Sequence, residues 1–337
     1  MKPVQILVIL TFILFRSSSD AHDRSVQPDE MLKVFFTKDS VTVLVTDSGL
    51  GGLAVCADIE SRLRNEHPFA GVKIIFCNAL PESDYGYNMM RSTDEKVQVF
   101  SDALEGMTRT YSPDIILIAC NTLSVLYEQT PFSRTATIPV VSIVNIGVEL
   151  MTRALKADPS STVIIFGTET TIDADSHRSL LIKNGIAQQR IFTQACPDLA
   201  GEIQADASSD AVATMIGFYG EDALGKLPAS KGPLYASLCC THYGYAGSRF
   251  RAMLDKSGRR RTSLIDPTRS MSDVIFPKKF SARFRRTASS VSVISRADIT
   301  PQEVRSIATL IDAQSHATAL ALASFELNKN LFEFMRK

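Results

Sequence analysis

The stretch VTVLVTDSGLGGLAVCADIESRLR, residues 41–64, carries a short apolar segment, a glycine-rich turn and an amphipathic segment in that order. Val41–Thr46 is apolar and β-branched on both parities, which is typical of a strand covered on both faces in a parallel sheet. Ala54–Arg64 has the periodicity of a helix. A strand followed directly by a helix is the repeating unit of α/β proteins, so this stretch predicts an α/β fold.

The same alternation continues along the chain. Further strands are predicted at Val72–Cys77, Ile115–Ala119, Val140–Val144, Val163–Phe166, Arg190–Gln194, Leu234–Leu238 and Ser263–Ile265. Further helices are predicted at Thr93–Thr110, Leu123–Glu128, Gly147–Lys156, Ser176–Asn184 and Ala211–Ala223. Strands that alternate with helices favour parallel sheets over a β-sandwich or a helix bundle.

The chain closes with a basic loop, a strand and a helix. Phe276–Arg286 is rich in cations and poor in aliphatic residues, and we expect a solvated connection there. The strand-like SVSVI follows, and a long amphipathic helix is predicted from Pro301 to about Phe332. Its apolar side chains, which include Leu310 and Leu320, would pack on the body of the chain or on a second subunit of a homodimer.

Composition limits the function classes. The chain has 337 residues, with 36 Lys and Arg against 36 Asp and Glu, so its formal net charge is zero. A nucleic-acid binder needs a basic face, which this balance does not favour. With 45% hydrophobic and 21% charged residues, the chain is long enough and apolar enough for one large domain or two. Six cysteines are too few for a disulfide-built mini-fold.

The N-terminus has the pattern of a secretory signal. Lys2 precedes an apolar run from Ile6 to Phe15 that is too short to span a bilayer. Ser19 and Ala21 place small residues at the −3 and −1 positions of a cleavage site after Ala21. The signal predicts export to the periplasm or the medium and no membrane segment afterwards. The alternatives are an uncleaved anchor, or a wrongly assigned start codon and a cytoplasmic chain.

Two predicted strand ends have similar sequences. Residues 115–122 read IILIACNT and residues 234–241 read LYASLCCT, so each apolar strand ends in a cysteine that is soon followed by threonine. Ligands of open α/β sheets bind beyond the carboxyl ends of the strands. We therefore expect Cys120 and Cys240 to face each other across one cleft between two similar halves.

A cysteine at such a position needs a partner before it can act as a base or nucleophile. Its free pKa is about 8.5, so at neutral pH the thiol is mostly protonated. The polar side chains close to the two thiols in sequence, or at the end of the first strand, are Asn121, Thr122, Thr241, His242 and Asp47.

The glycine-rich turn after the first strand is not a dinucleotide fingerprint. The third glycine of Gly49-Leu50-Gly51-Gly52 comes one position too early, and no Walker lysine follows. The glycines would instead let backbone N–H groups approach a small anion at a helix N-terminus, beside the side chains of Asp47 and Ser48.

Six motifs together resemble a known family. They are DSGLGG (47–52), DYGYN (84–88), ACNT (119–122), GTETT (167–171), ACP (195–197) and CTHY (240–243). Their order is similar to that of glutamate racemases, which belong to the cofactor-independent aspartate/glutamate racemase superfamily. The resemblance covers roughly residues 41–267.

The resemblance implies two pseudo-symmetric, doubly wound α/β domains with the active site in the cleft between them. The predicted division is a signal peptide at 1–21, a discontinuous first domain at 38–145 plus 264–300, a second domain at 146–263, and a C-terminal helical extension at 301–337.

The resemblance also implies a mechanism that needs no cofactor and no metal. Cys120 and Cys240 would be the catalytic thiols, one removing the α-proton as thiolate and the other returning a proton to the opposite face. Cys120 would serve the D-enantiomer, helped by Asp47, and Cys240 the L-enantiomer, helped by His242.

The implied substrate is glutamate, whose D-form feeds peptidoglycan biosynthesis. The positions that match substrate-holding residues are Asp47, Ser48, Tyr85, Gly86, Asn121, Thr122, Thr241 and His242. Their hydroxyl, amide and backbone donors suit a zwitterion with two carboxylates.

The chain departs from the family pattern at several places. Asp84 stands where a proline is usual, Cys239 replaces a glycine, and Gly244 replaces a proline. The family's acidic residue a few positions after ACP has no assigned counterpart, because Glu202 and Gln204 are both near. These departures and the signal leave two alternatives: a racemase for aspartate or another amino acid, and a non-catalytic exported protein that binds amino acids or wall fragments.

The other cysteines and histidines have structural interpretations. Cys56, Cys77 and Cys196 are expected in the core. We expect His22, His67 and His316 at the surface or in tails, and His177 against a helix. The spacing of these residues does not predict a metal site. Ser48, His242 and Asp47 would allow a hydrolase triad, but the sequence has no nucleophile-elbow motif.

Overall fold

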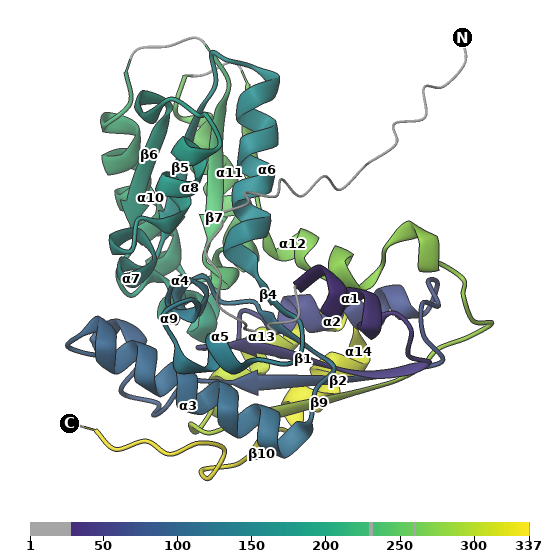
Figure 1. Ribbon diagram of the computed structural model, residues 1–337. Coiled ribbons are helices and arrows are strands. Elements are labelled where there is room, and N and C mark those ends of the chain that lie inside the picture. The colour runs from purple at the N-terminus through teal and green to yellow at the C-terminus, as the bar shows by residue number, and fades with distance from the viewer. Residues whose placement is uncertain (1–27, 229–231, 259–260, 337) are drawn as a thin grey trace, which may run out of the picture.

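A computed structural model describes residues 28–228, 232–258 and 261–336 (Figure 1). Its strands form two sheets in which every paired neighbour runs parallel. The six-stranded sheet has the order β10-β9-β2-β1-β3-β4, and the four-stranded sheet has the order β6-β5-β7-β8. The strands are β1 Ser40–Asp47, β2 Gly71–Asn78, β3 Ile115–Ile118, β4 Val140–Ser142, β5 Thr162–Gly167, β6 Ile191–Ala195, β7 Leu234–Cys239, β8 Thr262–Ile265, β9 Ala288–Ser295 and β10 Glu326–Leu327.

Helices cover both sheets. The α-helices are α1 Pro28–Phe35, α2 Leu53–Leu63, α3 Thr93–Tyr111, α4 Asn121–Tyr127, α5 Pro131–Thr135, α6 Ile143–Ala157, α7 Glu169–Asp173, α8 Ser176–Lys183, α9 Leu199–Asp206, α10 Asp210–Gly225, α11 Gly247–Asp255, α12 Thr268–Met271, α13 Pro301–Asp312 and α14 His316–Ala323. Short 3-10 turns are η1 Tyr87–Met89, η2 Gln188–Arg190, η3 Thr241–Ala246, η4 Ser272–Ile275 and η5 Lys278–Phe280. The α/β fold with parallel sheets is as predicted.

The two sheets repeat one winding pattern. Omitting β9 and β10, the first sheet reads β2-β1-β3-β4, and the second reads β6-β5-β7-β8, so each has its second, first, third and fourth strand in the same order. By this correspondence β3 is equivalent to β7. The predicted pseudo-symmetry of the two halves therefore holds at the level of strand order. The similar segments ACNT and CCT lie at equivalent strand ends.

Strand β1 shows why the first half forms a layered core. Val43, Leu44 and Val45 are fully buried. Val43 and Val45 belong to the apolar cluster on the side of α2, whereas Leu44 belongs to the cluster on the side of α3. Successive side chains of a strand point to opposite faces, so apolar residues at both parities serve two helical layers. Figure 1 shows α2 and α3 on opposite sides of this sheet.

The C-terminal segment differs from its prediction. Instead of one helix from Pro301 to Phe332, the chain forms α13 and α14, and then β10, which pairs with β9. Ser315 interrupts the helix because its hydroxyl accepts from the backbone N–H of Thr318 at 3.1 Å and donates to Glu60 Oε2 at 2.7 Å. This is the N-cap arrangement that begins a new helix.

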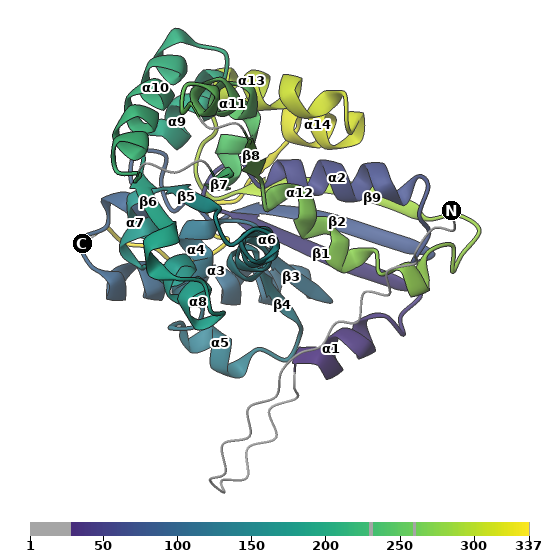
Figure 2. The same cartoon turned by 90° about the horizontal axis from the view of Figure 1, so that it is seen from above.

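Both C-terminal helices pack on the body of the chain. Ile311 and Leu322 are buried in the apolar cluster that includes α2, while Leu310 and Leu320 are exposed. Figure 2 shows α13 and α14 next to α2. The segment predicted as an extension thus completes the first half. The four-stranded sheet runs to Ile265, two residues past the predicted boundary at 263.

Two expectations concern membranes and the N-terminus. In residues 28–228, 232–258 and 261–336, no helix has the length and apolar character that a membrane crossing requires. The predicted signal peptide at 1–21 lies outside the described residues and stays a prediction.

Candidate active site

Both halves contribute to one cavity of about 470 Å³, and both predicted thiols line it. Cys120 follows β3 and is the N-cap residue of α4, while Cys240 follows β7 and precedes η3. Both are buried, with 5% and 7% of their surface exposed. Because β3 and β7 are equivalent strands, the two thiols reach the cavity from matching positions in the two halves.

Ser48 is the polar side chain in contact with the first thiol. Its Oγ lies 3.1 Å from Cys120 Sγ. Burial, and next the charge of Asp47, raise the pKa of Cys120 to about 12, although the bond to Ser48 acts in the opposite direction. The Cys120 thiol is therefore protonated at neutral pH.

His242 accompanies the second thiol. Its Nδ1 lies 3.8 Å from Cys240 Sγ. Burial raises the pKa of Cys240 well above its usual value, and the nearby Asp47 and Cys120 raise it further. Burial also lowers the pKa of His242. Cys240 and His242 thus form a neutral thiol–imidazole pair, in which a nitrogen is available at the sulfur.

Asp47 joins the two halves. Its Oδ1 accepts from the backbone N–H of Ser48 at 2.7 Å, and its Oδ2 accepts from the N–H of Gly52 at 2.6 Å and from the hydroxyl of Thr241 at 2.7 Å. The predicted helper of Cys120 therefore has its carboxylate engaged with these donors, and Ser48 makes the contact with that sulfur. Asp47 acts on both thiols through its charge.

The glycines of the first turn allow close packing against the other half of the molecule. A Cβ on Gly51 would lie 2.8 Å from the backbone N of His242, and one on Gly49 would lie 2.9 Å from His242 Cε1. Two of the turn's N–H groups bind protein side chains: Leu50 donates to Gln204 Oε1 at 2.8 Å and Gly52 donates to Asp47 Oδ2 at 2.6 Å. Gly49 and Gly51 thus admit the other half of the molecule.

Asn121 presents an unused donor to the cavity. Its Oδ1 lies 3.0 Å from Nε2 of His177, a buried histidine whose pKa is lowered to about 4 by burial. The ring is therefore neutral and donates from Nε2. Among the described residues, the buried Asn121 Nδ2 has no hydrogen-bond partner, and Asn121 lines the cavity. A carboxylate oxygen of a ligand would satisfy this donor.

The other predicted binding residues divide into two groups. Ser48, Gly86, Thr122, Thr241 and His242 line the cavity, and Thr122 Oγ1 is 2.8 Å from Thr168 Oγ1. Tyr85 does not line it. Its ring belongs to the buried core beneath the guanidinium of Arg336, which lies 4.3 Å from the ring centre.

Asp84 lies at the cavity and is paired. Its Oδ2 lies 3.2 Å from Arg336 Nη1, so the C-terminal residues offset the charge that replaces the usual proline. Both side chains of the pair are exposed, and such pairs contribute little to stability.

The comparisons with known proteins follow this geometry. No protein-family model matches the chain. A glutamate racemase of Aquifex pyrophilus is 29% identical over 153 residues, which are 45% of this chain and 54% of the relative. A glutamate racemase of Staphylococcus aureus (strain Newman) is 25% identical over 218 residues, which are 65% of this chain and 74% of the relative. The matched segment thus spans about half the length of the first of these relatives.

The chain is homologous to glutamate racemases. Solved structures agree in fold. A glutamate racemase isoform from Bacillus anthracis has a TM-score of 0.61 at 19% identity over 86% of this chain and 96% of that one. A glutamate racemase from Francisella tularensis, in complex with D-glutamate, has a TM-score of 0.62 at 21% identity over 81% of this chain and 94% of that one. The resemblance and the fold predicted from the sequence are thereby confirmed.

Two site residues escaped assignment from the sequence. Gln204 accepts at 2.9 Å from His242 Nε2, and its own amide donates to Glu303 Oε1 at 2.6 Å. Both line the cavity, as does Glu202. The sequence places Gln204 close to ACP without indicating a role for it, and Glu303 lies beyond the region of resemblance. The pattern S/T-x-x-E at Thr300–Glu303 predicts only a helix cap.

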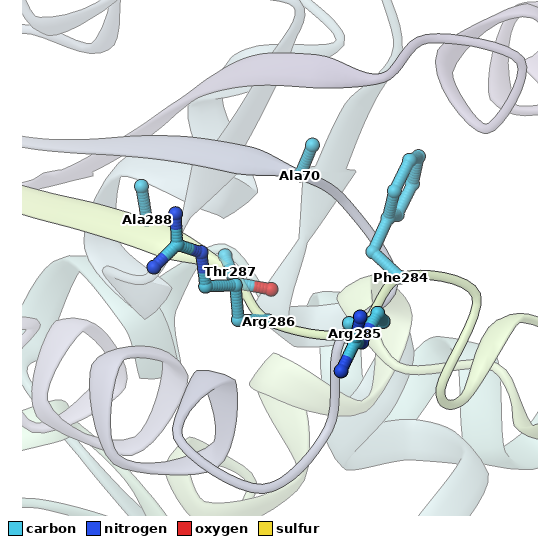
Figure 3. A pocket seen from close by; sticks show the side chains of 6 residues that line it. All are labelled: Ala70, Phe284, Arg285, Arg286, Thr287 and Ala288. Carbon is cyan, nitrogen blue, oxygen red and sulfur yellow. The ribbon is translucent and has the colours of Figure 1, made fainter.

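A second hollow, of about 600 Å³, lies at the opposite edge of the first sheet (Figure 3). It is lined by Ala70, Phe284, Arg285, Arg286, Thr287 and Ala288, next to the amino ends of β2 and β9. In parallel α/β sheets ligands bind at the carboxyl ends, where both thiols lie. Among the described residues, no group of three or more His, Cys, Asp or Glu side chains is placed to hold a metal ion.

Proposed function

We propose that this chain interconverts L-glutamate and D-glutamate by proton transfer between two cysteines, without a cofactor. The observation that carries the proposal is the placement of Cys120 and Cys240, buried, at equivalent strand ends of two similarly wound halves and in one cavity. Homology to glutamate racemases supports it, as does a structural neighbour in complex with D-glutamate. A receptor has no need of paired acid–base groups.

The proposed reaction balances with two thiols and one helper. The proton of Cys240 moves to Nδ1 of His242, and the resulting thiolate takes the α-proton of L-glutamate. Cys120 then gives its proton to the opposite face of the carbanion, which yields D-glutamate and a Cys120 thiolate. After product release the extra proton on His242 returns to Cys120 through solvent. The reverse reaction uses the same groups in the opposite order.

The lining of the cavity suits a zwitterion. Among the described residues that line it there is no lysine or arginine, so hydroxyl, amide and backbone donors would hold the carboxylates. Asn121 Nδ2 and the hydroxyl of Thr122 are such donors. Asp47 offers a negative charge to the substrate's ammonium group. Preorganised donors of this kind also stabilise the charge that develops on the carbanion.

Location and assembly belong to the proposal too. We propose that residues 1–21 direct export, which N-terminal sequencing of the protein made in its own host would test. A chain that begins at His22 or near it supports export, and an intact Met1 in the cytoplasm contradicts it. The homodimer is a separate proposal that light scattering of the purified protein would test.

The first test is isotope exchange at Cα. Reduced protein is incubated with L-glutamate in D₂O without added cofactor, and we expect deuterium at Cα together with D-glutamate. Cys120→Ser and Cys240→Ser should each abolish racemisation. Cys56→Ala is the matched control, because Cys56 is buried in the core away from the cavity. If wild-type protein exchanges no proton of glutamate but does exchange that of another amino acid, the substrate is wrong. If it exchanges none in a full panel, the enzyme proposal fails.

A further inference from the structure

A chain of hydrogen bonds links the second thiol to the C-terminal helices. His242 Nε2 lies 2.9 Å from Gln204 Oε1, which also accepts from the backbone N–H of Leu50 at 2.8 Å. At the other end of the amide, Gln204 Nε2 donates to Glu303 Oε1 at 2.6 Å. This series of hydrogen bonds therefore runs from Cys240 through His242 and Gln204 to α13.

The partners of Gln204 decide which way its amide points. A backbone N–H can only donate, so the atom facing Leu50 is the oxygen. An ionised carboxylate can only accept, so the atom facing Glu303 is the nitrogen. Glu303 is itself held, because its Oε2 accepts from the backbone N–H and the hydroxyl of Thr300, both at 2.8 Å. The capping box of α13 thus fixes the carboxylate that orients the amide.

The amide in turn decides which nitrogen of His242 carries the proton. Gln204 Oε1 cannot donate, so His242 Nε2 must. Burial keeps the imidazole neutral by lowering its pKa. In a neutral ring with a proton on Nε2, Nδ1 has a free lone pair, and this atom lies 3.8 Å from Cys240 Sγ.

We propose that Gln204 and Glu303 are positioning residues that hold His242 in the Nε2–H tautomer, so that its Nδ1 is free to take the proton of Cys240. In this step the S–H bond breaks, its electron pair stays on sulfur, and the proton forms an N–H bond at Nδ1. The effect of this tautomer on catalysis rests on the proposed racemase function, whereas the tautomer itself follows from the protein's own hydrogen bonds. The bond between Gln204 and Glu303 makes the C-terminal segment part of the site.

The decisive measurement is the protonation pattern of the His242 ring. Long-range ¹H–¹⁵N correlation spectra of the reduced full-length chain, labelled at histidine, distinguish the two neutral tautomers, and His242→Asn identifies the signals. We expect the wild-type protein to show the Nε2–H form. In Gln204→Leu the ring should shift to a mixture or to the Nδ1–H form. A wild-type ring protonated at Nδ1, or an unchanged ring in Gln204→Leu, would overturn the proposal.

A double variant in which the two side chains are exchanged controls for misfolding. In the double variant Gln204→Glu/Glu303→Gln, a carboxylate at 204 accepts from Leu50 and His242, and the amide at 303 donates to it. The net charge and the direction of each hydrogen bond at the histidine are kept, so the Nε2–H form should persist. Loss of that form in a folded double variant would contradict the proposed orientation.

Kinetics give the second readout. Gln204→Leu should lower kcat for L-glutamate at least about tenfold with KM within about twofold, because the step affected is proton transfer. The double variant should recover most of that loss. Gln302→Ala is the matched control, since it removes a neighbouring hydrogen bond from α13 to the backbone of Ala205 but keeps the Glu303–Gln204 bond. An equal loss of kcat in Gln302→Ala would show that any disturbance between α13 and Ala205 slows the reaction, and would refute the positioning role of Glu303.

The two proposals fail separately. If wild-type protein racemises no amino acid but shows the Nε2–H ring that Gln204→Leu disturbs, the racemase function is wrong and the tautomer inference stands. If racemisation is present and the ring is indifferent to Gln204, only the tautomer inference is wrong.

Discussion

Replacing Gly51 with alanine tests the close contact between the two halves. The added Cβ would lie 2.7 Å from Thr241 Cβ and 2.8 Å from the backbone N of His242, closer than real Cβ atoms approach other heavy atoms. Thr241 cannot escape by rotation alone, because its Cβ is also in the way. To make room, the start of η3 must move and the 2.7 Å bond from the Thr241 hydroxyl to Asp47 must lengthen or break.

The expected cost has two parts. A hydrogen bond to a buried charged group contributes about 1.5–3 kcal/mol. Overpacking a well-packed site costs about 1–3 kcal/mol. We therefore expect Gly51→Ala to lower the free energy of unfolding by about 2.5–6 kcal/mol. At about 2 °C per kcal/mol for a chain of this size, Tm should fall by about 5–12 °C.

The assay compares thermal unfolding of Gly51→Ala with that of Gly217→Ala. Gly217 lies inside α10, where a Cβ would meet no heavy atom within 4 Å. Alanine is the better helix former by about 0.5–1 kcal/mol, so the control should be slightly more stable than wild type. If Gly51→Ala melts within about 2 °C of wild type, the halves do not approach each other as described, and the reasoning about the turn is wrong.

Three further predictions use charges and thiols. Burial lowers the pKa of His177 from 6.5 to about 4, so the unfolded chain binds a proton at this residue before the folded protein does. The free energy of unfolding should therefore fall by about 3 kcal/mol through His177 as the pH drops from above 6.5 to 4. Denaturant titration should find this loss reduced in His177→Gln. With a pKa raised to about 12, Cys120 should react with iodoacetamide at a rate that climbs from pH 8 to pH 10 without a plateau, as mass spectrometry of its peptide would show; a plateau near pH 8.5 would refute the raised value. Arg336→Ala should raise KM for glutamate up to about fivefold with kcat unchanged, because it leaves the charge of Asp84 unpaired, and Asp84→Asn in the same chain should reverse the effect.

The strands and the two thiols were predictable because their signals are local. A run such as Val43–Val45 is apolar on both parities, and that pattern alone requires cover on both faces. Cys120 and Cys240 follow two such runs, so the same pattern marks the end of each strand and the cysteine there. Burial of both faces then leaves one place for a ligand, at the carboxyl edge.

The contacts that tune the thiols were not predictable, because they join distant parts of the chain. Ser48 and Cys120 are 72 residues apart, and Gln204 and Glu303 are 99 apart. The hydrophobic periodicity of the sequence does not indicate which side chains contact each other across a cleft. Tyr85 matches a family position for binding substrate, but it does not line the cavity, because its ring packs in the core beneath Arg336. This contact too joins distant parts of the chain.

The break in the C-terminal helix was missed for a different reason. The apolar period continues from α13 into α14, so the pattern predicts one helix. What ends α13 and begins α14 is Ser315, whose hydroxyl is buried against Glu60, a residue 255 positions earlier. A serine in an amphipathic pattern is tolerated in a helix as readily as it caps one, and only its distant partner decides.

The electrostatics of the protein groups around Cys240 imply that a substrate takes part in forming its own base. Burial raises the pKa of Cys240, and the charge of Asp47 and the neighbouring Cys120 raise it further, so a thiolate beside them is unfavourable without added positive charge. The ammonium group of an amino acid brings that charge into a cavity whose described lining has no lysine or arginine. It follows that thiolate should form on binding. The ultraviolet absorbance of thiolate should therefore rise when glutamate is added at pH 8, and Cys240→Ser should lose much of the rise. A succinate or glutarate control, which lacks the ammonium group, should produce no rise, and an equal rise with glutarate would refute this coupling.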